Sequence, residues 1–236
     1  MELSQYNEKH VRVTDICGET FTGVADFYNS DYVLHEYGTE EDSLIVGEYL
    51  LFASQIASIE EIEVHGTAEL RTERLILRRL RPEDAEPLHR YFGADPAMVR
   101  YSGWNPYETE EMAQETVRKM IDGYDDIHFY AWAMETDDVL FGTIGAYDHK
   151  DDRIEVGFSI VRACRGRGYA TEALKAVLAY LTENEDISCV TAWCASENIG
   201  SKRVLEKAGM RLIRTEKDGL AVEGRVYDKL LYEYRR

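Results

Sequence analysis

The sequence predicts an α+β chain in which a mixed central β-sheet, flanked by helices, follows a small all-β barrel domain. Residues 1–65 carry 14 acidic and two basic side chains, a charge of −12, whereas the remaining 171 residues carry −6. The acidic segment contains no proline and no strong helical stripe, but beyond it helical and strand-like periods alternate. These changes in charge and periodicity predict two domains.

The first domain consists of short apolar runs. Two of them flank a Cys17-Gly18 turn and predict a β-hairpin. Strands are expected over residues 11–15, 20–28, 32–37, 44–46, 49–52 and 56–62. A small five-stranded barrel fits strands of this length.

The second domain begins with a strand-like segment over residues 75–80. Asp84 can cap the helix that follows, which tolerates Pro87 in its first turn and ends at Gly93. Further helices are expected over residues 109–122, 169–182 and 198–208, and strands over 127–134, 139–147, 153–161, 187–194, 210–216 and 225–234. Trp132 and Trp193 alternate with apolar neighbours and are expected in the core.

These patterns set the expected domain bounds and exclude several classes of protein. A barrel over residues 1–64 is expected to lead through a polar connection, 65–71, into a domain over 72–236. No apolar run reaches the length of a membrane span, and acidic residues 1–65 would repel nucleic acid. The four cysteines have no metal-site spacing, so no metal is expected, and a reducing cytoplasm is the natural location.

The segment with the most chemical information is RACRGRGYATE, residues 162–172, between a predicted strand and a predicted helix. Gly166 and Gly168 would let the backbone pass close to a ligand, and the first N–H groups of the helix would attract an anion. Arg162, Arg165 and Arg167 form a basic island in an acidic chain. A pyrophosphate would explain this island, but so would a strand-to-helix turn with solvated arginines. A Rossmann loop and a P-loop both fit less well.

The segment Arg165-Gly-Arg-Gly-Tyr-Ala170 resembles the R/Q-x-x-G-x-G/A signature of the GNAT superfamily of N-acetyltransferases. Three further segments resemble the family in the correct order: RLILRRL at 74–80, EVGF at 155–158 and ENIGSKRVLEKAG at 197–209. The last is similar to the branch that acetylates ribosomal-protein N-termini. The resemblance implies a GNAT-type domain with acetyl-CoA as co-substrate.

The resemblance also implies which residues contact the coenzyme. Backbone groups of the strand end, Phe158, Ser159, Ile160 and Val161, would pair with the pantetheine arm. The pyrophosphate would lie on the loop and helix start, Arg165, Gly166, Arg167, Gly168, Tyr169, Ala170 and Thr171. Asn198 and Ser201 would face the coenzyme from the later helix, although helix capping alone explains both residues.

An acyl transfer to an amine needs a base, because an alkyl ammonium with a pKa near 10 is not a nucleophile. Glu155, Gly157 and Ser159 share the strand face that would look into the cleft. Glu155 is the carboxylate on this face, so it is the candidate general base. A solvated charge on a half-exposed strand is the alternative. Many family members carry a tyrosine acid seven residues after the helix asparagine, but Leu205 stands there. The ribosomal-protein branch also lacks this tyrosine, and the resemblance to it implies that the serine three residues after the asparagine, Ser201 here, is the substitute candidate acid.

The expected reaction moves an acetyl group from acetyl-CoA to a primary amine, either a protein N-terminus or a small cationic molecule. Tyr101, Trp104 and Tyr107 lie in a loop that resembles one wall of the family's acceptor site, although they could also pack onto the core. The alternative function is a non-catalytic protein that senses acetyl-CoA. The spacing of Asp15, Gly18, Phe21 and Gly23 resembles Sm-like barrels, but the charge makes RNA binding a weaker third hypothesis.

Overall fold

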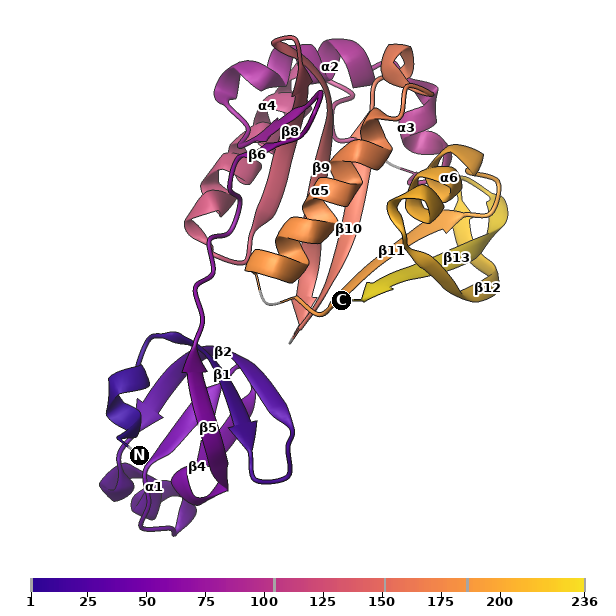
Figure 1. The fold of residues 1–236 in the computed structure, drawn as a ribbon. Helices are drawn as coiled ribbons and strands as arrows, with labels where there is room; N and C mark the ends of the chain where they lie inside the picture. Colours follow the sequence, from indigo (N-terminus) through magenta and orange to yellow (C-terminus); the bar gives the residue numbers. More distant parts are fainter. Residues whose placement is uncertain (1, 104, 151, 186, 236) are drawn as a thin grey trace. The chain divides into compact units, whose positions relative to one another are not determined.

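The structure is a computed structural model that describes residues 2–103, 105–150, 152–185 and 187–235. It divides into two compact units, one built from the first 64 residues and the other from most of the remaining chain (Figure 1). In the described part of the chain, no helix is long and apolar enough to cross a membrane.

The first unit contains a five-stranded antiparallel sheet with the order β4-β3-β2-β1-β5. Its strands are β1 (His10–Asp15), β2 (Thr20–Tyr28), β3 (Ser43–Val46), β4 (Tyr49–Phe52) and β5 (Ile56–Glu61), with 3₁₀ turns at Leu3–Tyr6 and Ala53–Gln55. Alternate residues such as Val11 and Val13 are fully buried, with Leu44 and Val46, in a small core.

A helix, α1 (Ser30–Tyr37), corrects the predicted strand over residues 32–37 and the expectation of an all-β domain. The side chain of Asn29 accepts a hydrogen bond from the amide of Tyr32, which satisfies one of the free N–H groups at the helix start. Val33 is the buried residue of this helix. Because α1 buries so little apolar surface, the segment shows no strong helical stripe. The capping residue Asn29 is the feature of the sequence that indicates a helix start here.

The second unit is a mixed eight-stranded sheet with the order β12-β13-β11-β10-β9-β8-β7-β6. Its strands are β6 (Leu70–Arg71), β7 (Ile76–Arg78), β8 (Tyr130–Thr136), β9 (Val139–Lys150), β10 (Arg153–Ile160), β11 (Cys189–Ala195), β12 (Arg211–Val222) and β13 (Arg225–Arg235). Its helices are α2 (Ala85–Phe92), α3 (Pro96–Arg100), α4 (Glu110–Asp122), α5 (Tyr169–Asn184) and α6 (Ile199–Ala208), with 3₁₀ turns at Pro82–Asp84, Gly123–Asp125 and Arg162–Cys164. This mixed sheet with flanking helices confirms the predicted fold class.

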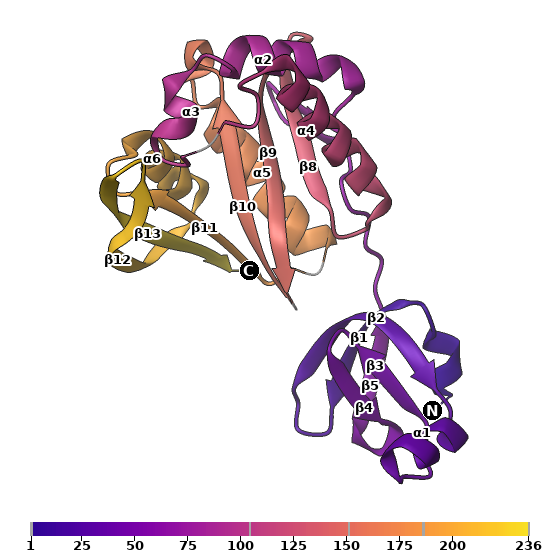
Figure 2. The same ribbon diagram turned by 180° about the vertical axis from the view of Figure 1, so that it is seen from behind.

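Helices cover the two faces of this sheet. Helix α5 lies along one face, over β9 and β10, whereas α4 lies on the opposite face near β8 (Figures 1 and 2). Strands β10 and β11 are parallel and are joined by α5, whereas β11–β13, β12–β13 and β8–β9 are antiparallel pairs. Trp132 is fully buried in the core, as predicted.

Residues 65–71, expected to form a polar connection, are folded onto the second unit. The backbone amides of His65 and Gly66 each donate a hydrogen bond to the buried carboxylate of Glu185 at 3.0 Å. The hydroxyl of Tyr130 donates to the same carboxylate at 2.9 Å. The hydroxyl of Tyr180 donates to the carbonyl of Gly66 at 2.7 Å. These contacts across 120 positions of sequence could not be recognised from local composition.

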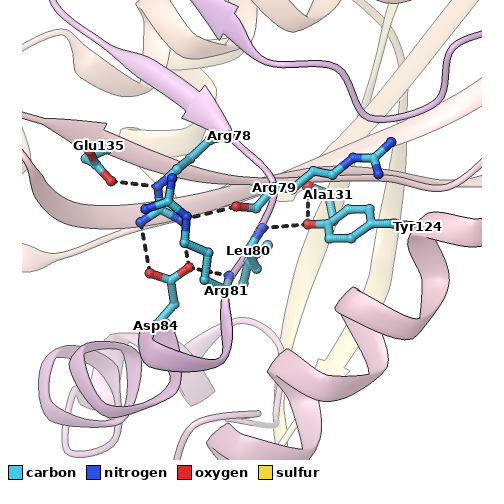
Figure 3. Close-up of polar contacts among 8 residues, drawn as sticks. All are labelled: Arg78, Arg79, Leu80, Arg81, Asp84, Tyr124, Ala131 and Glu135. Atoms are coloured by element: carbon cyan, nitrogen blue, oxygen red, sulfur yellow. Dashed lines mark hydrogen bonds and ion pairs between the residues drawn. The ribbon is translucent and has the colours of Figure 1, made fainter.

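A buried ion-pair cluster fixes the start of α2 against the sheet (Figure 3). The guanidinium of Arg78, on β7, donates to Asp84 at 2.8 and 2.9 Å and to Glu135, on β8, at 2.7 Å. Asp84 also accepts from the amide of Arg81 at 2.8 Å, so its carboxylate caps the 3₁₀ turn rather than α2. The hydroxyl of Tyr124 accepts from the amide of Leu80 and donates to the carbonyl of Ala131, both at 2.8 Å.

Replacing Arg78 with methionine is expected to lower the free energy of unfolding by about 3–5 kcal/mol, because two buried carboxylates lose their cation. Arg90→Met is the matched control, since Arg90 pairs with Glu86 on an exposed helix surface, where ion pairs contribute little. Urea denaturation of both variants measures the difference. Equal stability of the two variants would contradict a stabilising role for the cluster.

Candidate functional site

The second unit contains a cavity of about 660 Å³, formed by α3, the end of β10, the loop after it, the first turn of α5 and one side of α6. Most of the predicted site residues line this cavity. They are Tyr101, Phe158, Ser159, Ile160, Arg165, Gly166, Gly168, Tyr169, Ala170, Thr171, Asn198 and Ser201. Segments about 100 residues apart in the sequence therefore meet at one place.

The N-terminus of α5 is open toward the cavity. Helices α3, α4 and α6 are capped by the side chains of Asp95, Thr109 and Asn198, whereas α5 begins after Gly168, which has no side chain. Gly168 has a φ of 85°, a left-handed conformation that favours glycine. The first amides of this 16-residue helix have no acceptor within the helix, so they present an anion-binding surface to the cavity.

Arg74 holds this helix start in place. Its Nε donates to Glu172 at 2.7 Å, one of its terminal nitrogens donates to the carbonyl of Arg167 at 3.2 Å, and its guanidinium lies 4.8 Å from the ring centroid of Tyr169. Burial alone would raise the pKa of Glu172, but hydrogen bonds from Thr72 and Arg74 outweigh it and lower that pKa. Arg167 itself is exposed and does not line the cavity.

Strands β10 and β11 separate at the edge of the cavity. Their pairing runs from Arg153↔Cys189 to Glu155↔Thr191, and within the described residues it does not continue along the rest of β10. Phe158, Ser159 and Ile160 lie beyond this fork and line the cavity.

Val161 corrects the expectation that it would offer free backbone groups. Its amide donates to the carbonyl of Phe141, and its carbonyl accepts from the amide of Cys164. Both groups are therefore engaged, because the chain turns into the 3₁₀ segment at this residue.

Helix α3 was not predicted, and it brings an acidic partner to the loop. Asp95 precedes this helix, and its carboxylate accepts a hydrogen bond from Arg165 at 2.6 Å. The Nε of Arg165 donates to the carbonyl of Ile160 at 3.2 Å. Arg165 therefore ties the loop to α3 and to the end of β10, in addition to lining the cavity.

The three aromatic residues expected at the acceptor site have different positions. Tyr101 lines the cavity, and its hydroxyl donates to the carbonyl of Glu197 at 3.2 Å. Trp104 lies outside the described residues. Tyr107 is buried against Phe92, so the expectation that it forms an acceptor wall is wrong. The side chain of Asn105 accepts from the amide of Tyr107 and donates to the carbonyl of Phe92, which turns Tyr107 inward.

Glu155 is half-buried at the fork and is not among the residues that line the cavity. The indole Nε1–H of Trp193 donates to its carboxylate at 2.9 Å, and the hydroxyl of Tyr147 also interacts with it. Trp193 is therefore a partner of Glu155 at the fork and not a core residue as predicted. The alternation that suggested a core position also places Trp193 on the same side of β11 as Thr191, the register partner of Glu155.

Asn198 and Ser201 lie together at the start of α6. The side-chain oxygen of Asn198 accepts from the amide of Ser201 at 3.2 Å, which is the helix cap considered from the sequence. Leu205, at the position of the missing tyrosine, is buried in the core.

The cavity combines three features that suit an elongated anionic ligand. They are the open N-terminus of α5, the end of β10 where it no longer pairs with β11, and the side chains of Arg100, Arg203 and Lys207. Glu197 also lines it. The amides and cations can hold a diphosphate, and the separated strand can pair with an extended arm. The geometry of the site therefore suits a long, phosphate-bearing ligand lying against a forked sheet.

Comparisons with known proteins assign the family. A family model described as an acetyltransferase (GNAT) domain matches residues 74–211. The chain is 30% identical over 167 residues to "Uncharacterized N-acetyltransferase YoaA" of Bacillus subtilis (strain 168), covering 69% of this chain and 94% of that protein. The chain belongs to the GNAT family of acetyltransferases, as predicted, and is an acetyl-CoA-dependent N-acetyltransferase.

Solved structures agree with this family. A GNAT-family acetyltransferase from Bacillus anthracis superposes with a TM-score of 0.63 and 25% identity, covering 71% of this chain and 98% of that chain. RimL, described as a ribosomal L7/L12 alpha-N-protein acetyltransferase in complex with coenzyme A, gives a TM-score of 0.66 at 17% identity, covering 71% and 98%. At this identity the likeness to RimL shows the fold.

Proposed function

We propose that the protein transfers the acetyl group of acetyl-CoA to a primary amine by direct attack, with Glu155 as the general base. The observation that carries this proposal is the fork between β10 and β11. Glu155 is the last residue of β10 that pairs with β11, while Ser159, four residues further on the same face of the strand, lines the cavity.

In this proposal, the cavity orients the coenzyme. The amides of Tyr169, Ala170 and Thr171 would hold its diphosphate, and the backbone of Phe158, Ser159 and Ile160 would pair with its pantetheine arm. The coenzyme supplies a thioester, whose carbonyl carbon accepts the amine nitrogen while the carbon–sulfur bond breaks. Holding the two reactants in register makes the attack effectively unimolecular, which can supply a large part of the rate enhancement.

Two proton transfers accompany the reaction. Glu155 would take a proton from the acceptor ammonium, directly or through water, because only the neutral amine attacks. The nitrogen of the intermediate loses a second proton as the carbon–sulfur bond breaks, and the departing thiolate gains one. The hydroxyl of Ser201, which lines the cavity, is the proposed relay: it would give its proton to the sulfur and regain one from the nitrogen, directly or through water.

The proposed acceptor is a protein N-terminal amine, with a small cationic amine as the second candidate. The chain is 26% identical to "Putative ribosomal N-acetyltransferase YdaF" of Bacillus subtilis (strain 168), covering 68% of this chain and 90% of that protein. Tyr101 supports an acceptor wall because it lines the cavity and packs edge-on against Tyr227, 5.4 Å between ring centroids.

Thiol release tests the proposal. Acetyl-CoA is mixed with the protein and a panel of peptides, polyamines and aminoglycosides, and free coenzyme A thiol is measured against a reaction without amine. We expect release that depends on both the protein and at least one amine. Tight binding of acetyl-CoA without amine-dependent release would instead favour the sensing function.

For the first unit we propose a Sm-like spacer or partner-binding module that does not bind RNA. The five-stranded antiparallel sheet supports the comparison with Sm-like folds, and the charge of −12 on residues 1–65 opposes phosphate binding. Fluorescence anisotropy of the full chain with labelled RNA at moderate salt is expected to show no binding. Saturable binding would revive an RNA-associated role.

A further inference from the structure

Two aromatic side chains from the neighbouring strands contact the carboxylate of Glu155. Trp193 comes from β11 and Tyr147 from β9, so Glu155 on β10 lies between them. The Trp193 Nε1–H donates to Oε1 of Glu155 at 2.9 Å. Sequence patterns did not single out either aromatic residue as functional, and the proposed reaction assigns neither a role.

The fork explains how Trp193 reaches Glu155. Thr191 is the last residue of β11 paired with β10, and Trp193 follows two positions later on the same face. The indole of Trp193 therefore extends from the separating strand to the carboxylate of Glu155. Trp193 is half-buried, and the Nζ of Lys229 lies 4.8 Å from its ring centroid.

On the other side, Gly157 makes room for Tyr147. A Cβ atom at Gly157 would lie 2.9 Å from the Tyr147 hydroxyl oxygen and 3.2 Å from its ring, closer than real Cβ contacts allow without a shift. The Tyr147 side chain is 46% exposed, but partial burial of its hydroxyl and the negative charge of Glu155 raise the pKa of Tyr147. Asp148 also carries a charge near this tyrosine.

We propose that Trp193 and Tyr147 are positioning residues that hold the carboxylate of Glu155 in one orientation for proton transfer. This inference rests on the proposed function. A hydrogen bond donated to a carboxylate oxygen restrains the side chain and fixes the direction of its remaining lone pairs. A purely structural role would satisfy a half-buried charge without affecting proton transfer.

Kinetics of Trp193→Phe and Tyr147→Phe test this role. Tyr91→Phe is the matched control, because Tyr91 is an exposed residue of α2. Losing a donor is expected to lower kcat/KM by about tenfold at neutral pH, because the carboxylate is no longer held in one direction. We expect kcat to fall while the Kd for coenzyme A stays unchanged, because neither residue lines the cavity. In a Glu155→Gln background, Trp193→Phe should cause no further loss of kcat.

The indole N–H resonance of Trp193 provides a readout without turnover. In ¹⁵N-labelled protein it is identified by its absence in Trp193→Phe, and its proton should lie downfield of an exposed indole N–H because it donates to a carboxylate. In Glu155→Gln it should move upfield, because a neutral acceptor makes a weaker hydrogen bond.

The outcomes separate the positioning role of Trp193 and Tyr147 from the proposed acetyl transfer. Unchanged kcat in both variants, or a Trp193→Phe loss that multiplies with that of Glu155→Gln, would overturn the positioning role while leaving acetyl transfer intact. A wild-type protein that releases no thiol with any amine would overturn the proposed function and the positioning role together.

Discussion

Glu155→Gln is expected to lower kcat by about 10²–10⁴-fold at neutral pH, the range that a positioned general base contributes. Glutamine keeps the size of the side chain and can still accept from the Trp193 indole, so the fold should be retained. The loss should shrink as pH rises toward 10, because more of the acceptor amine becomes neutral without help.

Thiol release as a function of pH measures this effect, and coenzyme A affinity should stay at the wild-type value. Glu86→Gln is the matched control, since Glu86 is exposed on α2. A Glu155→Gln protein with wild-type kcat would rule out Glu155 as the base and leave a bound water in that role.

Gly168→Val is expected to raise the Kd for coenzyme A by about 10- to 100-fold. A β-branched residue does not tolerate the φ of 85° at this position, so the first turn of α5 must shift and its open amides lose their alignment. A strain of roughly 1–3 kcal/mol corresponds to that range of affinity.

Gly18→Val provides a matched control, because Gly18 has the same φ of 85° but lies in a turn of the first unit. It should leave the calorimetric Kd for coenzyme A unchanged. Equal, wild-type affinities of the two variants would show that the start of α5 does not determine coenzyme binding.

Local sequence signals were sufficient for the central elements. The apolar stripe of α5, the alternation of β10 and the glycines of the loop each specify their own conformation. The structure brings most of the predicted site residues to one cavity, but Glu155, Val161 and Arg167 do not line it. The family resemblance supplied the coenzyme, which local patterns alone left open.

The missed features depend on contacts between distant segments. Trp193 looked like a core residue because the separation of β10 from β11 has no local signature. Asp95 gained its role through Arg165, 70 positions away. Tyr107 turned inward because Asn105 hydrogen bonds to Phe92, 13 positions earlier. Periodicity reports which face of an element is apolar, but it does not report these tertiary partners.

Calorimetric titration of the wild-type protein with coenzyme A and with pantetheine tests most directly whether the start of α5 holds a diphosphate. The two ligands share the thiol-bearing arm, but pantetheine lacks the diphosphate and the nucleotide. We predict saturable binding of coenzyme A that weakens with salt, and at least tenfold weaker binding of pantetheine. No binding of coenzyme A, or equal binding of both ligands, would contradict the proposed site.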